Sequence, residues 1–362
     1  MKKLTASVLA ALALSLSFSA VPNHVFAEKK VEKQKEVKVN KKIKEALDEF
    51  FEARDSEFKD GKEAKLLNNN ADKSIHYVKY MEEVHGIKLK DFKSKYTVDS
   101  VKEDKKSKTT EVTLSLIQEL TFDNGIDSGF SDQITVNLDE NLNINHELSA
   151  KTLKNEIDTD KLIKIGKEIK EKQRKLEKNK KKDNSKLNSE KAISAQSYSY
   201  DGADAATYAR KYALSPNPAY ATWGNDCTNF VSQALHYGGI PERLTTSGNY
   251  LKWYYTTSYD VSPSWINVDD FYEVLNSYTI FSSELDYASE LELGDVVQYD
   301  MYEDGDWNHT AIVTKITTSG TRDLPLVSYH SENQLNVAWD FYVAYYESRG
   351  IDCDYRLIDI HE

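Results

Sequence analysis

The stretch Asn225-Asp226-Cys227-Thr228-Asn229-Phe230-Val231-Ser232-Gln233-Ala234-Leu235 places a cysteine where a polar loop gives way to a helical pattern. Four of its apolar residues share one face of the predicted helix: Phe230, Val231, Ala234 and Leu235. Asn225 or Asp226 is a suitable N-cap, so Cys227 would lie in the first turn. Because a helix N-terminus favours the nucleophilic thiolate, the stretch predicts a reactive cysteine.

Cys353 is the other cysteine of the chain. In an exported protein two cysteines can form a disulfide, and a Cys227–Cys353 bond is one alternative. The polar loop in front of Cys227 favours a reactive thiol instead. Cys353 lies in the alternating segment Ile351-Asp352-Cys353-Asp354-Tyr355, and we expect it to be a strand residue without a chemical role.

Residues 1–27 have the pattern of a secretory signal peptide. Lys2 and Lys3 precede an apolar run from Leu4 to Val21, and Ala27 offers a small residue before a cleavage site. We therefore expect a secreted, extracellular protein, possible association with the cell wall, and no contact with the membrane except through this segment. An uncleaved anchor is the alternative, although the apolar run barely reaches spanning length. Residues 28–42 are highly charged and are predicted to be disordered.

Residues 43–150 predict a small α+β accessory domain. Helical spacing runs from Ile43 to Phe58 and again over 74–85, with Gly86 as a natural stop. The period then changes to two, which predicts an antiparallel meander. The pattern weakly resembles the cystatin or nuclear-transport-factor type of fold. We find no candidate catalytic cluster in this region and expect it to position the rest of the chain.

Residues 151–196 are rich in lysine and predict a helical linker. Too few apolar residues accompany the helical spacing to suggest burial, so a solvated spacer is expected. The alternative is an anchor on an anionic wall polymer or on lipid headgroups.

The composition changes at Ser197. The region from there to the end holds 8 Lys and Arg against 25 Asp and Glu, a net charge of −17, whereas the rest of the chain carries +5. Such an acidic region argues against nucleic acid as a partner. Residues 197–362 predict a second α+β domain, in which helices over 201–214, 227–237 and 268–278 accompany a small antiparallel sheet.

Two histidines mark matching strand ends in this domain. His309 opens a buried strand, and His330 follows the next, antiparallel strand. Because neighbouring strands lie ~5 Å apart, we expect the two side chains to touch near Cys227. A thiol nucleophile needs a base, and the base needs a group that orients it. The pattern is therefore typical of a thiol hydrolase.

Four motifs in this order resemble the papain-like NlpC and CHAP wall hydrolases, and most closely the putative amidase domain family, over about 198–359. They are the segment from Pro218 to Gly224, the stretch from Asp226 to Ala234, Leu293-Gly294-Asp295-Val296-Val297 and His309-Thr310-Ala311-Ile312-Val313. The resemblance implies a papain-like fold with the cysteine helix packed on the sheet.

The resemblance also implies roles for single residues. Cys227 would be the nucleophile, His309 the base and His330 the third catalytic residue, with Asn333 or Asn336 as alternatives for the third position. Tyr220 would stabilise the oxyanion together with the Cys227 N–H, or would simply be a core tyrosine. No metal or other cofactor is implied.

We therefore expect a secreted, monomeric cysteine hydrolase that cleaves amide bonds of peptidoglycan or another wall peptide through an acyl-enzyme. Either the muramoyl–alanine amide or a stem-peptide bond would suit, and a transferase could use the same intermediate. A non-catalytic wall-binding or adhesion protein that keeps the fold is the alternative from a different class.

Overall fold

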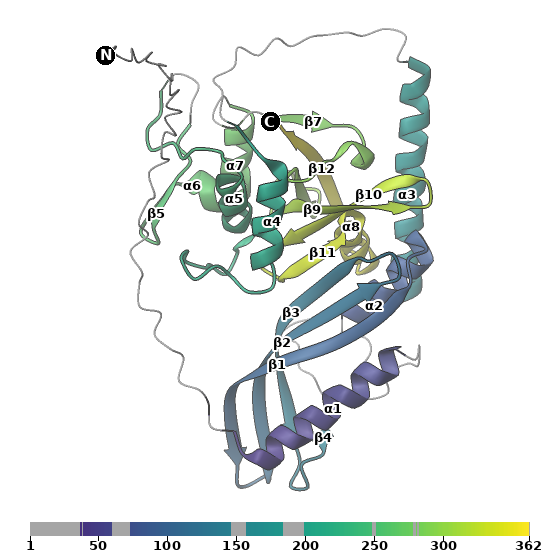
Figure 1. Ribbon diagram of the computed structural model, residues 1–362, viewed down its shortest axis with the longest axis vertical. Coiled ribbons are helices and arrows are strands. Elements are labelled where there is room, and N and C mark those ends of the chain that lie inside the picture. The colour runs from purple at the N-terminus through teal and green to yellow at the C-terminus, as the bar shows by residue number, and fades with distance from the viewer. Residues whose placement is uncertain are drawn as a thin grey trace, which may run out of the picture. The chain divides into compact units, whose positions relative to one another are not determined.

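The computed structural model of the chain describes residues 37, 39–59, 73–145, 157–183, 199–247, 251–277, 280 and 282–361 (Figure 1). Helices and antiparallel strands are mixed within these residues, which confirms the predicted α+β class. The predicted signal peptide, most of the segment 28–42 that is predicted to be disordered, and residues 151–156 and 184–196 of the predicted linker lie outside them. In the described part of the chain, no helix is long and apolar enough to cross a membrane.

The N-terminal region forms the predicted helix and meander. Its elements are α1 (Lys41–Lys59), β1 (Leu89–Asp104), β2 (Thr109–Phe122), β3 (Asp127–Leu138) and β4 (Ile144–Asn145). In β2 every second residue from Val112 to Phe122 is buried, as expected for a strand with one apolar face. Leu47 and Phe51 of α1 pack on that face. Full burial of such a side chain stabilises the fold by roughly 1.5–3 kcal/mol.

A second helical segment ends where the sequence predicts. Helix α2 (Lys73–Tyr80) continues into the π-helical turn η1 (Met81–His85). Gly86 then adopts a φ of 73°, a left-handed conformation that glycine tolerates without steric strain. The predicted glycine stop is confirmed.

Helix α3 (Thr159–Asp183) differs from the expected solvated spacer. It is helical as predicted, but Leu162, Ile165 and Ile169 are buried in a core that includes side chains of the C-terminal region. The Lys170 ammonium donates to the Val84 carbonyl at 2.6 Å and to the Ser319 hydroxyl at 2.8 Å. Three apolar side chains at helical spacing suffice for a buried face, because the surrounding lysines extend into solvent.

The C-terminal region supplies the remaining elements. Its helices are α4 (Gly202–Tyr212), α5 (Cys227–Tyr237), α6 (Pro263–Ile266), α7 (Val268–Leu275), the 3-10 turn η2 (Ala288–Glu290) and α8 (Trp339–Ser348). Its strands are β5 (Tyr255–Thr257), β6 (Asp260–Val261), β7 (Ser282–Leu285), β8 (Val296–Met301), β9 (His309–Ser319), β10 (Arg322–Tyr329), β11 (Gln334–Ala338) and β12 (Cys353–Ile360).

One large sheet contains strands from both regions. Its order is β1-β2-β3-β11-β10-β9-β8-β12-β7, with β4 beside β3. The junction is the antiparallel pairing of β3 with β11, where Phe130 lies opposite Gln334. The predicted domain boundaries remain a prediction, but backbone hydrogen bonds continue across the junction. A small separate sheet is formed by β5 and β6.

The central strands bury both faces. Val297 of β8 and Ala311 and Val313 of β9 belong to the core that contains residues of α8, which we call the α8 face. Val296 and Ile312, one position away, belong to the core that contains residues of α5, which we call the α5 face. This alternation follows from strand geometry, since successive side chains point to opposite faces. Polar residues of these strands can therefore reach Cys227 only if their side chains point to the α5 face.

Candidate functional site

The cysteine helix begins where the sequence predicts. Helix α5 starts at Cys227, and the Asp226 carbonyl accepts the Phe230 N–H at 3.0 Å. The Asp226 carboxylate does not cap the helix. It instead accepts hydrogen bonds from the Trp223 N–H at 3.1 Å and the Asn229 amide at 2.8 Å. Asp226 thus fixes the loop that precedes the thiol.

Cys227 is a free thiol and so is Cys353, so the structure does not contain the alternative disulfide. Only 3% of the Cys227 surface is exposed. Burial raises the pKa of this thiol, and hydrogen bonds from the Thr310 backbone and the Thr228 hydroxyl partly oppose that rise. The thiol is therefore protonated in this state of the protein, close to donors that would stabilise a thiolate.

His330 lies on the α5 face next to the start of the cysteine helix. Its Nδ1 lies 2.7 Å from Asp226 Oδ2, and its Nε2 lies 2.9 Å from the Tyr212 carbonyl oxygen. The ring also stacks on Phe230 at 4.1 Å. The ring is thus held between the loop before α5 and the last residue of α4.

His309 lies on the α8 face. Its ring stacks on Tyr342 at 4.5 Å with an interplanar angle of 8° and meets Tyr329 edge-on at 4.6 Å. Nε2 is buried without a hydrogen-bond partner among the described residues. Burial lowers the pKa of His309 to about 3, so the ring is neutral.

The expectation that His309 and His330 touch is wrong. Thr310, the residue after His309, faces α5 and contacts the Thr228 hydroxyl at 3.1 Å. His309 therefore points to the opposite face of the sheet. Matching positions at the ends of two strands bring backbones together, but the alternation of side chains separates these two rings.

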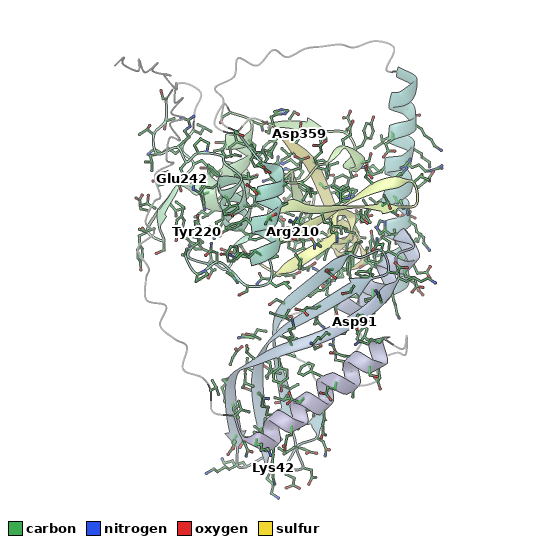
Figure 2. The ribbon with its side chains drawn as sticks, in the orientation of Figure 1. Lys42, Asp91, Arg210, Tyr220, Glu242 and Asp359 are labelled. Atoms are coloured by element: carbon green, nitrogen blue, oxygen red, sulfur yellow. The ribbon has the colours of Figure 1, made fainter. Side chains whose placement is uncertain are left out.

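Tyr220, labelled in Figure 2, lies in the segment before α5. Its ring lies 4.8 Å from that of Tyr255 and stacks with that of Trp265 at 6.4 Å. Burial raises the pKa of its hydroxyl to about 12. These contacts are those of the core tyrosine that the sequence left as an alternative, and the oxyanion role remains a prediction.

The two asparagines weighed as orienting groups lie at the junction of β3 and β11. The Asn336 amide donates to the Asp127 carbonyl at 2.7 Å and accepts from the Thr314 hydroxyl at 2.8 Å. The Asn333 carbonyl accepts the Ser131 N–H at 2.9 Å. Neither arrangement orients His309.

Three polar residues near the thiol were not predicted from the sequence, and Asp226 was expected only to cap the helix. Gln298, Thr310 and Thr228 are fully buried beneath the thiol, although strands and a helix face of this kind are otherwise apolar. A glutamine in the run Val296-Val297-Gln298-Tyr299 was the available signal, because a buried polar side chain needs partners.

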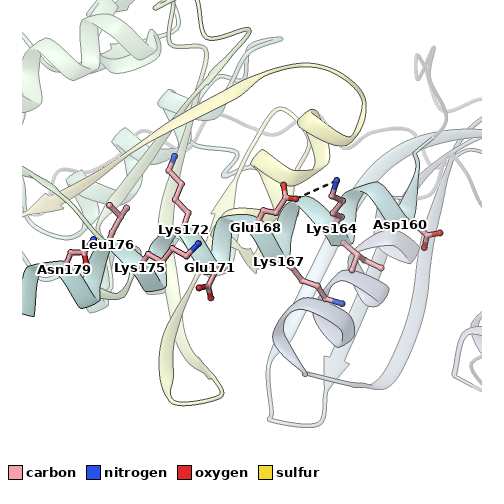
Figure 3. Close-up of a pocket in the computed structure, with 10 residues that line it drawn as sticks. Asp160, Lys164, Lys167, Glu168, Glu171, Lys172, Lys175, Leu176 and Asn179 are labelled. Carbon is pink, nitrogen blue, oxygen red and sulfur yellow. Dashed lines mark ion pairs between the residues drawn. The ribbon is translucent and has the colours of Figure 1, made fainter.

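A large hollow lies elsewhere, along the outer face of α3 (Figure 3). It encloses about 770 Å³ and its lining mixes lysines with acidic side chains, including the Lys164–Glu168 ion pair. All of its lining residues come from α3, so it does not open on Cys227. Among the described residues, no cluster of three or more His, Cys, Asp or Glu could hold a metal ion.

Part of the chain matches a family model and two curated proteins. Residues 199–352 match the model described as "Putative amidase domain". Two curated relatives come from Bacillus subtilis (strain 168): uncharacterized protein YjcM, 36% identical over 156 residues, and uncharacterized protein YhbB, 30% identical over 159 residues. The matches cover 39% and 44% of this chain, and a third and a half of those relatives.

No solved structure matches the chain. The family match covers the cysteine helix, both histidines and the strands between them. Residues 199–352 are thus similar to an amidase-like hydrolase domain.

Proposed function

We propose that the chain is an amide hydrolase with Cys227 as its nucleophile. The match of residues 199–352 to an amidase-named family supports hydrolysis of an amide. The place of Cys227 at the start of α5 supports the nucleophile, because unpaired N–H groups in a first helical turn stabilise a thiolate. A papain-like arrangement, expected from the sequence, is part of this proposal.

His330 serves as the base and Asp226 as its orienting group. The observation that carries this assignment is the 2.7 Å contact between His330 Nδ1 and Asp226 Oδ2, since Asp226 directly precedes the nucleophile. His309, the base implied by the family resemblance, points to the other face and is the competing assignment. To act, the His330 ring must exchange its Tyr212 partner for the thiol.

The reaction follows the usual order of thiol hydrolases. With its ring proton on Nδ1 and donated to Asp226, His330 takes the Cys227 proton at Nε2, and the sulfur attacks the carbonyl carbon to form a tetrahedral intermediate. The C–N bond breaks as the imidazolium protonates the leaving amine, which leaves an acyl-enzyme. His330 then removes a proton from water, the hydroxide displaces the sulfur, and the thiol is restored.

We propose that the substrate is peptidoglycan and that the protein acts outside the cell. Support comes from the signal-like pattern of residues 1–27 and from the amidase-named match. Muramoyl–alanine amides and stem-peptide bonds both have the required chemistry.

Digestion of purified sacculi tests this proposal. The full chain and its Cys227→Ala variant are incubated with sacculi, and the soluble fragments are identified by mass spectrometry. We expect fragments with one newly hydrolysed amide from the wild type and none from the variant. Intact muropeptides in both samples would refute the hydrolase.

One observation favours a second candidate, a non-catalytic wall-binding protein. The thiol is nearly inaccessible, burial raises its pKa, and the His330 nitrogens are both occupied by other partners. This candidate predicts equal binding to sacculi by the wild type and Cys227→Ala, without hydrolysis by either.

A further inference from the structure

A line of polar side chains crosses the α5 face and ends at the thiol. It consists of Arg356 on β12, Gln298 on β8, Thr310 on β9 and Thr228 on α5. Arg356 lies directly opposite Gln298 in the sheet, and Gln298 lies opposite Thr310. The last three residues of the line are completely buried. A buried polar row of this kind requires hydrogen bonds between its members.

Each neighbouring pair is within hydrogen-bond distance. Arg356 Nε lies 2.7 Å from Gln298 Oε1, and Gln298 Nε2 lies 3.3 Å from Thr310 Oγ1. Thr310 Oγ1 lies 3.1 Å from Thr228 Oγ1, which in turn lies 3.9 Å from Cys227 Sγ. The line therefore connects the guanidinium to the sulfur without a gap.

The chemistry of the groups fixes the direction of these bonds. A guanidinium only donates, so the Gln298 oxygen faces Arg356 and the Gln298 amide nitrogen donates to Thr310. The Thr310 oxygen then accepts from Gln298, which leaves its own hydrogen for Thr228. The Thr228 hydroxyl, having accepted, can turn its hydrogen toward the sulfur.

We propose that Arg356, Gln298, Thr310 and Thr228 form a donor chain that keeps a hydroxyl hydrogen directed at Cys227 Sγ and so stabilises the thiolate. They are positioning residues, and the use of the thiolate as a nucleophile rests on the proposed function. In a buried site, consecutive bonds that begin at a cation polarise one another toward the final donor.

Groups around the thiol change its pKa in both directions. The Asp226 carboxylate, whose side chain contacts His330 Nδ1 at 2.7 Å, raises the pKa of Cys227. At the far end, the Arg356 guanidinium lies between the rings of Tyr272 and Trp307. The hydroxyl of Thr228 and the backbone of Thr310 lower the pKa of the thiol against the effect of burial.

The rate of Cys227 alkylation by iodoacetamide, followed against pH, measures the thiolate directly. Peptide mass spectrometry separates Cys227 from Cys353 in the full chain. Thr310→Val keeps the side-chain shape but ends the donor chain, whereas Thr310→Ser keeps the hydroxyl. We expect Thr310→Val to shift the curve by about one pH unit upward and to slow alkylation about 10-fold at pH 7. Thr310→Ser should stay within about 2-fold of the wild type.

Two further variants keep the test decisive. Gln298→Met has a similar volume without a donor and should slow alkylation about 3-fold at pH 7. Thr228→Val replaces Thr310→Val if the latter does not unfold cooperatively. Unchanged curves in the valine and methionine variants would overturn the donor chain, and so would a Thr310→Ser variant as slow as Thr310→Val.

The alkylation assay uses no wall substrate. A shifted curve combined with intact sacculi would therefore retain the donor chain and refute the proposed hydrolase. Digestion of sacculi combined with unshifted alkylation curves would support the proposed hydrolase and refute the donor chain.

Discussion

The two faces of strands β8, β9 and β10 hold two histidines in opposite environments. On the α5 face, the two ring nitrogens of His330 contact the carboxylate of Asp226, which precedes Cys227, and the carbonyl of Tyr212. On the α8 face, His309 is stacked among tyrosines and its Nε2 has no partner among the described residues. Both rings are buried, but His330 has hydrogen-bond partners on both nitrogens, whereas His309 is packed among aromatic rings. On the proposed function, the face of the sheet rather than the position along a strand decides which histidine can serve the thiol.

The largest expected effect comes from the thiol itself. Cys227→Ala removes the proposed nucleophile, and we expect hydrolysis of sacculi to fall by about 1,000-fold or more. Cys353→Ala is the matched control, because Cys353 is the other free, buried cysteine and lies in the core of the α8 face. Comparable loss of activity in both variants would show that the effect is structural.

Asp226→Asn tests the α5 face further. The variant removes the charge that orients His330 while keeping the size of the side chain. We expect hydrolysis to fall by about 10- to 100-fold, since the base would lose its preferred orientation. Initial rates on sacculi measure this, with the exposed neighbour Asn225→Ala as control. Full activity of Asp226→Asn would remove Asp226 from the site.

The neutral ring on the α8 face predicts a pH-dependent stability. Because folding lowers the pKa of His309 below its unfolded value, the unfolded chain binds one more proton below pH ~6.5. The free energy of unfolding should therefore fall by up to ~1.4 kcal/mol per pH unit as the pH drops below that value, until the pH nears the folded pKa. His309→Phe should lack this contribution.

Urea unfolding of the wild type and His309→Phe at pH 7.5 and 4.5 checks this. Relative to the wild type, the variant should lose roughly 2 kcal/mol less between the two pH values. An equal loss in both proteins would show that His309 is not held neutral by the fold.

The smallest expected effect concerns the rim of the α8 face. Lys73 on α2 pairs with Glu332 at 2.6 Å, and its ammonium lies 4.2 Å from the Tyr345 ring centre. The Lys73 side chain is only 13% exposed, but that of Glu332 is 47% exposed, so solvent reaches the carboxylate and screens the pair in part. In a double-mutant cycle of Lys73→Met and Glu332→Gln, we expect a coupling energy of about 0.5 kcal/mol. A coupling energy of several kcal/mol would contradict this and would show that the contact strongly stabilises the packing of α2 on the C-terminal region.

Local patterns predicted much of the fold. The aromatic face of α1, the alternation in β2, the Gly86 stop and the start of α5 at Cys227 all follow from spacing within a few residues. The pairing of β3 with β11 and the burial of α3 were not predicted, because they depend on contacts between residues far apart in the chain.

The candidate site was predicted only in part. Cys227 and a neighbouring His330 were predicted from the sequence. The prediction for His309 was based on the expectation that the first residue of its strand faces the nucleophile. The direction of His309 depends on the register of β9 against α5, which the Thr228–Thr310 contact reveals. Asp226 and the buried row through Gln298 depend on side-chain partners that spacing does not show.

The most direct test of the account compares the two histidines in one assay. His330→Ala and His309→Phe are each confirmed to unfold cooperatively and are then incubated with sacculi at pH 7.5. The face assignment predicts at least about 100-fold slower amide hydrolysis by His330→Ala and nearly wild-type hydrolysis by His309→Phe. An active His330→Ala with an inactive His309→Phe would contradict it and would assign the base to the opposite face.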